Sequence, residues 1–233
     1  MKPAINALII LIFTAATSFA ASQQTSSTTG AQIITKARYY LNASTIWNDT
    51  ELLEWINDGV VDIAARSRCT ETKQAITLAA NTLEYSITIN YIAISAVVYS
   101  PASGALTGLL RGHPNHVGRS DADTMMESVK QPQYWYDWKG DIGIYPPRNT
   151  AVTGETVYLY AVARPSDLTA TTSLVTVPAI YDRALTMYVV GQAFMKMDQW
   201  AKSARFMAEC YTEVDRYRQD YVDLPRQQRK EVE

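Results

Sequence analysis

Two histidines lie three residues apart in the segment His113-Pro-Asn-His116, and Asp121 and Asp123 follow them. Imidazole and carboxylate groups at such spacing are ligands that zinc takes in proteins. A stable zinc site needs three or four ligands with ordered partners behind them, and this loop holds no further histidine or cysteine. The pattern therefore predicts a polar turn and no metal site.

Other chemical motifs are missing from the sequence. No Gly-x-Gly-x-x-Gly or Walker pattern could cradle a phosphate, and no Gly-x-Ser-x-Gly elbow presents a nucleophile. Two histidines so close together do not make a convincing set of nucleophile, base and acid with any serine or cysteine. We therefore expect no catalytic residue, no cofactor and no enzymatic activity.

An aromatic run, Tyr134-Trp135-Tyr136-Asp137-Trp138, is predicted to be a strand. Because side chains alternate along a strand, Tyr134, Tyr136 and Trp138 share one face and Trp135 lies on the other. Rings on one strand face could stack on a sugar, as an exported protein might require. A sheet core combined with a subunit contact explains the run more simply.

The composition is that of a globular protein. Of 233 residues 47% are hydrophobic, and a chain of this size buries about 70–75% of its unfolded surface without a metal or disulfide. The formal net charge of −2 argues against a dedicated nucleic-acid-binding protein. Tyrosine occurs 15 times and phenylalanine 4 times, which suits either surfaces buried between subunits or a partly hydrated core.

The two cysteines, Cys69 and Cys210, have neither metal-binding spacing nor a redox motif. We predict that both are buried as small hydrophobic residues near helix ends. They would remain thiols in a reducing cytoplasm, whereas export would allow them to pair.

Residues 1–22 have the pattern of a secretory signal peptide. Lys2 precedes an apolar run over 4–16, and Ser18-Phe19-Ala20 fits a small-x-small cleavage site. The run is shorter than the roughly 20 residues that span a membrane comfortably. Taken alone, the segment indicates export, with a mature chain that starts near Ala21 and is flexible as far as Thr29.

Helical periodicity marks both ends of the remaining chain. Apolar residues at helical spacing predict two amphipathic helices within 31–68, joined by a polar corner. Asn48 stands where the second helix should begin, and Glu51 three residues later completes a start like a capping box. After Pro178, two further helices are separated only by 197–199, which predicts an antiparallel helix hairpin.

The middle of the chain has the signals of strands. We expect a hairpin from 75–78 and 83–87 around 79–82, a long strand over 91–100 and a second hairpin from 134–138 and 141–145. The strand over 157–162 alternates poorly, which predicts that both of its faces are covered. Residues 102–131 are predicted to form a long loop, with a helical turn near 121–126.

Together these patterns predict an α+β fold: a four-helix bundle from the N- and C-terminal helix pairs, with an inserted antiparallel β-sheet or small barrel. The predicted parts are an N-terminal arm (1–29), the helical bundle (30–68 and 177–222), the β subdomain (72–165) and a charged C-terminal tail (223–233).

The order of residues over 34–68 resembles the opening of tailed-phage head-to-tail adaptor proteins, also called connector or tail tubular proteins. The matching residues are Ala37-Arg38, Leu41-Asn42, Trp47, Asp49, Glu51-Leu52-Leu53, Trp55 and Asn57-Asp58-Gly59. The C-terminal helices are similar too, in the stretch from Tyr181 to Phe194 and in the paired small residues Ala201 and Ala204. The resemblance extends over residues 30–220.

This resemblance implies a structural virion protein without enzymatic activity. It implies a dodecameric ring that docks on the portal protein at the head–tail junction, extends the DNA channel and provides a platform for a tail, nozzle or tail tube protein. DNA would pass through the lumen without sequence recognition during genome ejection, and no membrane would be involved. Assembly would take place in the host cytoplasm, where the apolar N-terminal arm could be buried between ring subunits or against a tail component instead of directing export.

The resemblance places portal docking in the C-terminal tail, and ring geometry places other contacts on the β part. The expected portal-docking residues are Arg216, Arg218, Asp220, Tyr221, Leu224, Arg226, Arg229 and Lys230. The expected subunit or tail contacts are Arg111, His113, His116, Tyr134, Tyr136 and Trp138. The signal-like start and the aromatic strand leave one alternative open, an exported periplasmic or surface module of a bacterium that binds carbohydrate or protein.

Overall fold

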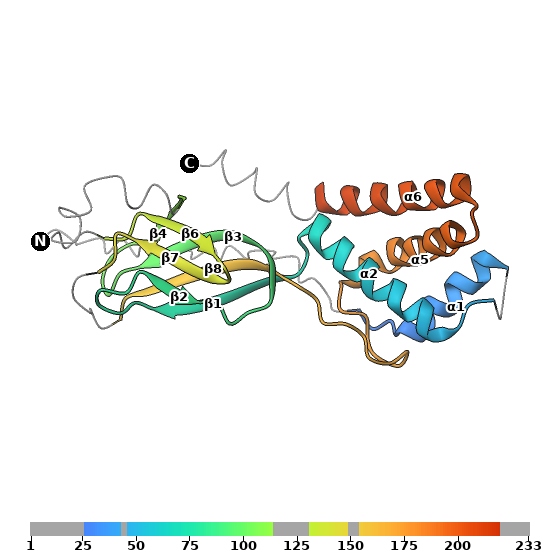
Figure 1. Ribbon diagram of the computed structural model, residues 1–233, viewed down its shortest axis with the longest axis horizontal. Helices are drawn as coiled ribbons and strands as arrows, with labels where there is room; N and C mark the ends of the chain where they lie inside the picture. The colour runs from blue at the N-terminus through green and yellow to red at the C-terminus, as the bar shows by residue number, and fades with distance from the viewer. Residues whose placement is uncertain (1–25, 43–45, 114–130, 149–153, 220–233) are drawn as a thin grey trace, which may run out of the picture.

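The computed structural model describes residues 26–42, 46–113, 131–148 and 154–219. Helices from both ends of the chain lie together at one end of an elongated molecule, and strands from the middle of the chain form the other end (Figure 1). The combination of helices and sheets confirms the α+β class. The helical turn near 121–126 and the tail over 223–233 lie outside the described residues, as does most of the N-terminal arm.

The N-terminal helices are α1 (Gly30–Leu41) and α2 (Asp49–Ser67). The Thr29 and Gln32 side chains cap α1 reciprocally in a capping box. At the start of α2, the Asn48 side chain accepts a hydrogen bond from the Glu51 amide at 2.7 Å, which confirms the predicted cap. Both helices end at a residue with left-handed backbone angles, Asn42 and Arg68, which turns the chain sharply.

The C-terminal helices are α5 (Asp182–Lys196) and α6 (Trp200–Arg218), and a short 3₁₀ helix, η1 (Ala179–Tyr181), precedes them. They pack against each other as the predicted antiparallel hairpin. Helix α5 is central, because it packs against α1, α2 and α6 and is buried from Ala184 to Phe194 except at Gln192. None of the described helices is both long enough and apolar enough to cross a membrane.

One hydrophobic core joins these four helices. Its largest fully buried side chains are Ile33, Leu52, Ile56, Val60, Ile63, Tyr181 and Leu185. Cys69 and Cys210 lie in this core as free thiols, which confirms their predicted burial. Cys210 lies well inside α6 and not near a helix end. Burial raises the pKa of both thiols, that of Cys210 to about 12, so neither is poised to react at neutral pH.

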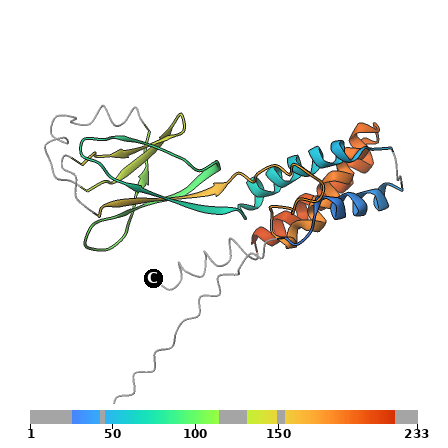
Figure 2. The ribbon, with the colours of Figure 1, turned by 90° about the horizontal axis from the view of Figure 1, so that it is seen from below.

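The strands of the described residues form two four-stranded sheets. In the first sheet the strand order is β1 (Glu71–Thr77), β8 (Thr156–Ala163), β3 (Tyr91–Ser100) and β4 (Thr107–Gly108). In the second sheet it is β2 (Glu84–Ser86), β7 (Asp141–Tyr145), β6 (Tyr134–Trp138) and β5 (Leu110–Arg111). The sheets face each other across a second core, which includes Val97, Tyr99, Trp135, Ile142, Ile144, Val157 and Leu159. Figure 2 shows this two-layered half beside the helices.

The two sheets differ from the single antiparallel sheet or small barrel that the sequence suggested. The prediction of a hairpin around 79–82 was wrong. β1 pairs with β8 in the first sheet, whereas β2 pairs with β7 in the second. The strand pattern contained no information about this, since both strands direct apolar residues into the same core. The hairpin of β6 and β7 is confirmed, and its turn residues Lys139 and Gly140 both have positive φ. Within the expected long loop, β4 and β5 are short strands.

The prediction that β8 is covered on both faces was also wrong. Val157, Leu159 and Ala161 face the core, whereas Tyr158 and Tyr160 face outward, and Tyr160 is 37% exposed. The misleading signal came from tyrosine, whose ring counts as apolar in a periodicity pattern but tolerates water. The Lys73 ammonium lies 3.7 Å from the centre of the Tyr158 ring on this outer face.

Residues 164–178, here called the return segment, lead from β8 back to the helices. This segment runs alongside the start of α1, where the Ala31 amide donates to the Thr171 carbonyl at 2.7 Å and the Val175 amide donates to the Thr28 carbonyl at 2.9 Å. The segment therefore ties the N-terminal helix to the rest of the helical half.

Candidate functional site

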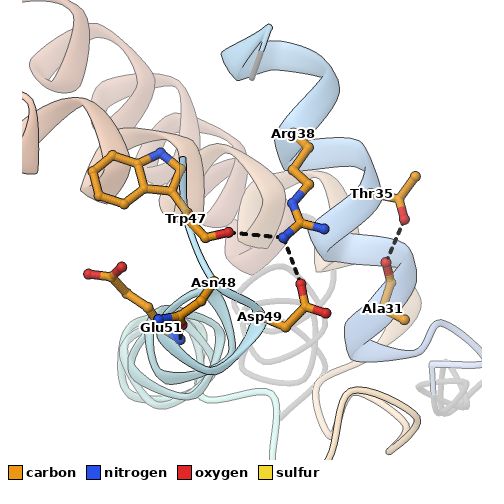
Figure 3. A network of polar contacts seen from close by, with 7 residues as sticks. All are labelled: Ala31, Thr35, Arg38, Trp47, Asn48, Asp49 and Glu51. Atoms are coloured by element: carbon orange, nitrogen blue, oxygen red, sulfur yellow. Dashed lines mark hydrogen bonds and ion pairs between the residues drawn. The ribbon is translucent and has the colours of Figure 1, made fainter. Parts of the chain in front are cut away.

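The corner between α1 and α2 holds a network of polar contacts (Figure 3). The Arg38 guanidinium reaches from α1 and donates to the Trp47 carbonyl at 3.0 Å and to the Asp49 carboxylate at 2.7 Å. Asp49 is the first residue of α2, where a negative charge also favours the helix dipole. One arginine thus fixes the angle between the two helices.

Aromatic and charged groups connect this corner to α5. The Trp47 ring lies edge-on to Trp55, with ring centres 5.4 Å apart. Lys196, in the last turn of α5, forms an ion pair with Glu51, and its ammonium lies 5.2 Å from the centre of the Trp47 ring. The corner is therefore braced against the C-terminal helix pair and not only within the N-terminal pair.

Two residues in the middle of α2 bring neighbouring segments close. The Asn57 side chain accepts from the Leu168 amide at 2.8 Å and donates to the Leu168 carbonyl at 3.2 Å, so it pairs with the return segment as a backbone group would. A Cβ at Gly59 would lie 2.7 Å from Tyr188 and 2.8 Å from Leu185, which shows how closely α5 approaches. The sequence motif Asn57-Asp58-Gly59 thus has a packing role that its pattern alone did not reveal.

The end of α2 is bound to α6 by a two-pronged ion pair. Arg66 donates to the two carboxylate oxygens of Asp215 at 2.7 and 2.6 Å, and its guanidinium lies 4.5 Å from the centre of the Tyr211 ring. The hydrogen bonds from Arg66 hold the pKa of Asp215 below its ordinary value of 3.8. Fork-like pairing of this kind is geometrically specific as well as attractive.

This ion pair predicts a pH-dependent difference between wild type and Asp215→Asn. Because the pKa of Asp215 is lowered in the folded state, its contribution is complete above the ordinary value of 3.8 and is lost as pH falls through the lower folded value. The side chains of Arg66 and Asp215 are 41% and 43% exposed, so we expect the wild type to gain no more than about 1 kcal/mol at pH 7.

Urea unfolding of both proteins between pH 7 and pH 2 measures that difference. It should be constant down to about pH 4 and should shrink at lower pH. A difference that stays constant to pH 2 would contradict the assignment of Asp215 as the titrating partner.

The predicted contact residues on the β part differ in accessibility. Tyr134 and Trp138 are 39% and 50% exposed, and Arg111 on β5 lies 5.3 Å from the centre of the Trp135 ring. His113 is exposed, whereas His116 lies outside the described residues.

Tyr136 is only 4% exposed, although it shares a strand face with Tyr134 and Trp138. It stands opposite Gly143 on β7, and its ring covers this glycine so closely that a Cβ there would be 2.0 Å from the ring. Its hydroxyl donates to Glu84 at 3.0 Å, and burial raises its pKa to about 12. A neighbouring subunit could reach little of this side chain.

The predicted portal-docking residues are described only in part. Arg216 is exposed and lies 4.8 Å from the centre of the Tyr217 ring, and Arg218 donates to the Arg66 carbonyl at 3.2 Å. The remaining residues, which are Asp220, Tyr221, Leu224, Arg226, Arg229 and Lys230, lie outside the described residues.

The described residues contain no group of three or more histidine, cysteine, aspartate or glutamate side chains that could hold a metal ion. This does not cover the whole His-Pro-Asn-His pattern, because His116, Asp121 and Asp123 lie outside those residues.

The contacts described so far are ion pairs, hydrogen bonds and packing contacts that hold α1, α2, α5 and α6 together. A family model described as SU10 adaptor protein matches residues 28–231. The chain belongs to the SU10 adaptor protein family. Several of the residues that carried the resemblance to head-to-tail adaptors, Arg38, Asp49, Asn57 and Gly59 among them, form the corner, the pairing with the return segment and the close approach to α5.

A protein of the SU10 adaptor family is a structural protein of the phage head-to-tail junction, and this membership implies a non-enzymatic role in the virion. One similar solved structure is titled as the neck of an empty GTA particle computed with C6 symmetry. The two chains are 12% identical, the match covers 78% of this chain and 93% of that chain, and the TM-score is 0.27. This likeness is too distant to carry an argument. No curated protein matches the chain.

Proposed function

We propose that this adaptor forms a dodecameric ring that docks on the portal, extends the DNA channel and provides the attachment platform for the tail. Membership in the SU10 adaptor family is the observation that carries the proposal. Identical wedge-shaped subunits that associate head to side close a ring when the rotation between neighbours divides a full turn. We further propose that the four helices form a bundle, and that the domain boundaries are those predicted from the sequence.

The frame of the helical half supports this role. Ion pairs and hydrogen bonds brace α1, α2, α5 and α6 at separate points: the corner, the Lys196–Glu51 pair and the Arg66–Asp215 pair. A rigid subunit keeps the angle between neighbours constant, which is what closure of a ring requires. The β half extends away from this frame and displays Tyr134 and Trp138, which suits contact with a neighbour or with a tail protein.

Portal docking is assigned to the C-terminal tail, together with Arg216 and Arg218 at the end of α6. Residues 216–233 alternate basic and acidic side chains, and Tyr221 and Leu224 would serve as apolar anchors among them. Because a ring presents many identical tails to the portal, their contacts would add up and make binding depend on several subunits acting together. The near-neutral chain suits a lumen through which DNA slides without being gripped.

Electron microscopy of the adaptor mixed with its portal protein tests this proposal. We expect rings with twelve subunits stacked coaxially on the portal. A chain truncated after Gln219 should lose at least tenfold in affinity for the portal while its circular dichroism spectrum is unchanged. The matched control is Arg205→Ala on the exposed face of α6, which should bind the portal as wild type does.

Two outcomes would contradict the proposal. One is a truncated chain that binds the portal with wild-type affinity, which would remove the tail as the docking element. The other is an adaptor that remains a monomer at high concentration with portal present, which would favour the exported binding module instead.

A further inference from the structure

A groove of about 820 Å³ runs between α1 and α6, with η1 and the first half of α5 as its floor. Ile180 and Met187 lie on the floor, and Tyr39, Tyr40 and Tyr217 line the sides. Tyr39 is 87% exposed and Tyr40 is 49% exposed. Neighbouring aromatic side chains that are this exposed, beside a groove with an apolar floor, are typical of a surface that binds another segment or molecule.

Most of the charged side chains that line the groove have partners, and Lys36 on α1 is an exposed cation beside them. Arg183 and Arg216 lie 3.8 and 4.0 Å from the Glu213 carboxylate. The Asp182 carboxylate accepts hydrogen bonds from the hydroxyls of Ser26 and Thr28. The lining therefore combines aromatic and apolar side chains with charged ones, most of which already have partners, and its apolar part suits an apolar occupant.

The described chain begins at the rim of this groove. Ser26 is 2% exposed, and its hydroxyl donates to Asp182, which lines the groove, at 3.0 Å. The residues that precede it include the run over 4–16, which contains five isoleucine and leucine side chains in succession and no charged residue. Residues 17–25 span up to about 30 Å when extended, so the apolar run is tethered within reach of the floor.

We propose that residues 4–16 occupy the groove of their own subunit, with isoleucine and leucine side chains against Ile180, Met187 and the three tyrosines. The tether gives the run a high local concentration at its own groove, which favours it over a second copy of the chain. The C-terminal tail is a poorer occupant of the floor, because it alternates charges whereas Ile180 and Met187 are apolar. This inference does not depend on ring formation or on portal docking.

Cysteine pairs in the full-length chain test the proposal. Ile5→Cys, Ile9→Cys and Ile12→Cys are each combined with Ala179→Cys, an exposed position in the groove lining. The control combines the same arm cysteines with Ala201→Cys, which is exposed on α6 outside the groove. The native Cys69 and Cys210 are buried and do not compete. After mild oxidation, non-reducing gels and mass spectrometry identify the disulfides.

We expect at least one arm position to form an intramolecular disulfide with Ala179→Cys at least tenfold faster than with Ala201→Cys. Adding Ile180→Asp, which places a charge on the floor, should slow this reaction at least fivefold. Three results would overturn the proposal: disulfides that link two chains, equal rates for the groove and control positions, or a purified chain that lacks residues 1–20. The first would assign the groove to a second copy, and the last would show that the segment is removed.

Discussion

Replacing Glu155 with alanine is expected to lower the free energy of unfolding by about 3–5 kcal/mol. Glu155 and Arg148 are 4% and 8% exposed, and they meet through two contacts, at 2.8 and 2.9 Å. Removing the carboxylate would take away the negative charge that the buried guanidinium contacts at both oxygens, which costs far more than the pair itself contributes. Burial, together with the Glu155 carboxylate, also raises the pKa of Tyr99 to about 12, so the substitution would take a polar neighbour from the buried Tyr99 hydroxyl as well.

Urea unfolding followed by tryptophan fluorescence measures this effect. The matched control is Glu209→Ala, which breaks the exposed Arg205–Glu209 pair and should change stability by less than about 0.5 kcal/mol. Replacing both buried partners, as Arg148→Met with Glu155→Leu, should restore most of the loss because neither position then buries a charge. A single Glu155→Ala variant as stable as the Glu209→Ala variant would show that water reaches this pair.

Leucine at position 59 should destabilise the helical half by about 3 kcal/mol or more. A Cβ alone would lie 2.7 Å from Tyr188 and 2.8 Å from Leu185, and a leucine adds three further carbon atoms in the same direction. Overpacking of a filled core typically costs about 1–3 kcal/mol, and here the clash is with a central helix that itself contacts α1 and α6. Helix α5 cannot move away without disturbing those contacts.

Two variants isolate the cause of that loss. Ala65→Leu adds a comparable side chain at an exposed position of the same helix and should stay within about 0.5 kcal/mol of wild type. Gly59→Ala should fall between them, because better helix propensity offsets about 1 kcal/mol of the clash. Circular dichroism melting measures all three. If the Gly59→Leu protein had the same melting temperature as the Ala65→Leu protein, α2 and α5 would have to lie further apart than described.

The helices were predictable because their signals are local. The apolar stripes, the Asn48 cap and the short link between α5 and α6 all lie within a few residues of the features that they determine. The hairpin of β6 and β7 was predictable for the same reason, since Lys139-Gly140 supplies its turn within the chain itself.

The strand pairing across the sandwich was not predictable from such signals. β1 pairs with β8, some 80 residues later, and the alternation of side chains indicates only which face is apolar and not which sheet receives the strand. The same limit applies to the candidate site. Asn57 and Gly59 were recognised as part of a motif, but their partners, Leu168 and Tyr188, are distant in sequence.

The β half is inserted between two residues that bond to each other. Thr70 accepts from the Ala163 amide at 2.6 Å and returns a hydrogen bond from its hydroxyl to the Ala163 carbonyl at 2.7 Å. The β half therefore leaves the helical half and returns to it at one pair of hydrogen-bonded residues, Thr70 and Ala163. A change in the length of a strand far from this junction would therefore leave the helix packing intact, whereas a change near Ile92, which packs against the helical core, would not.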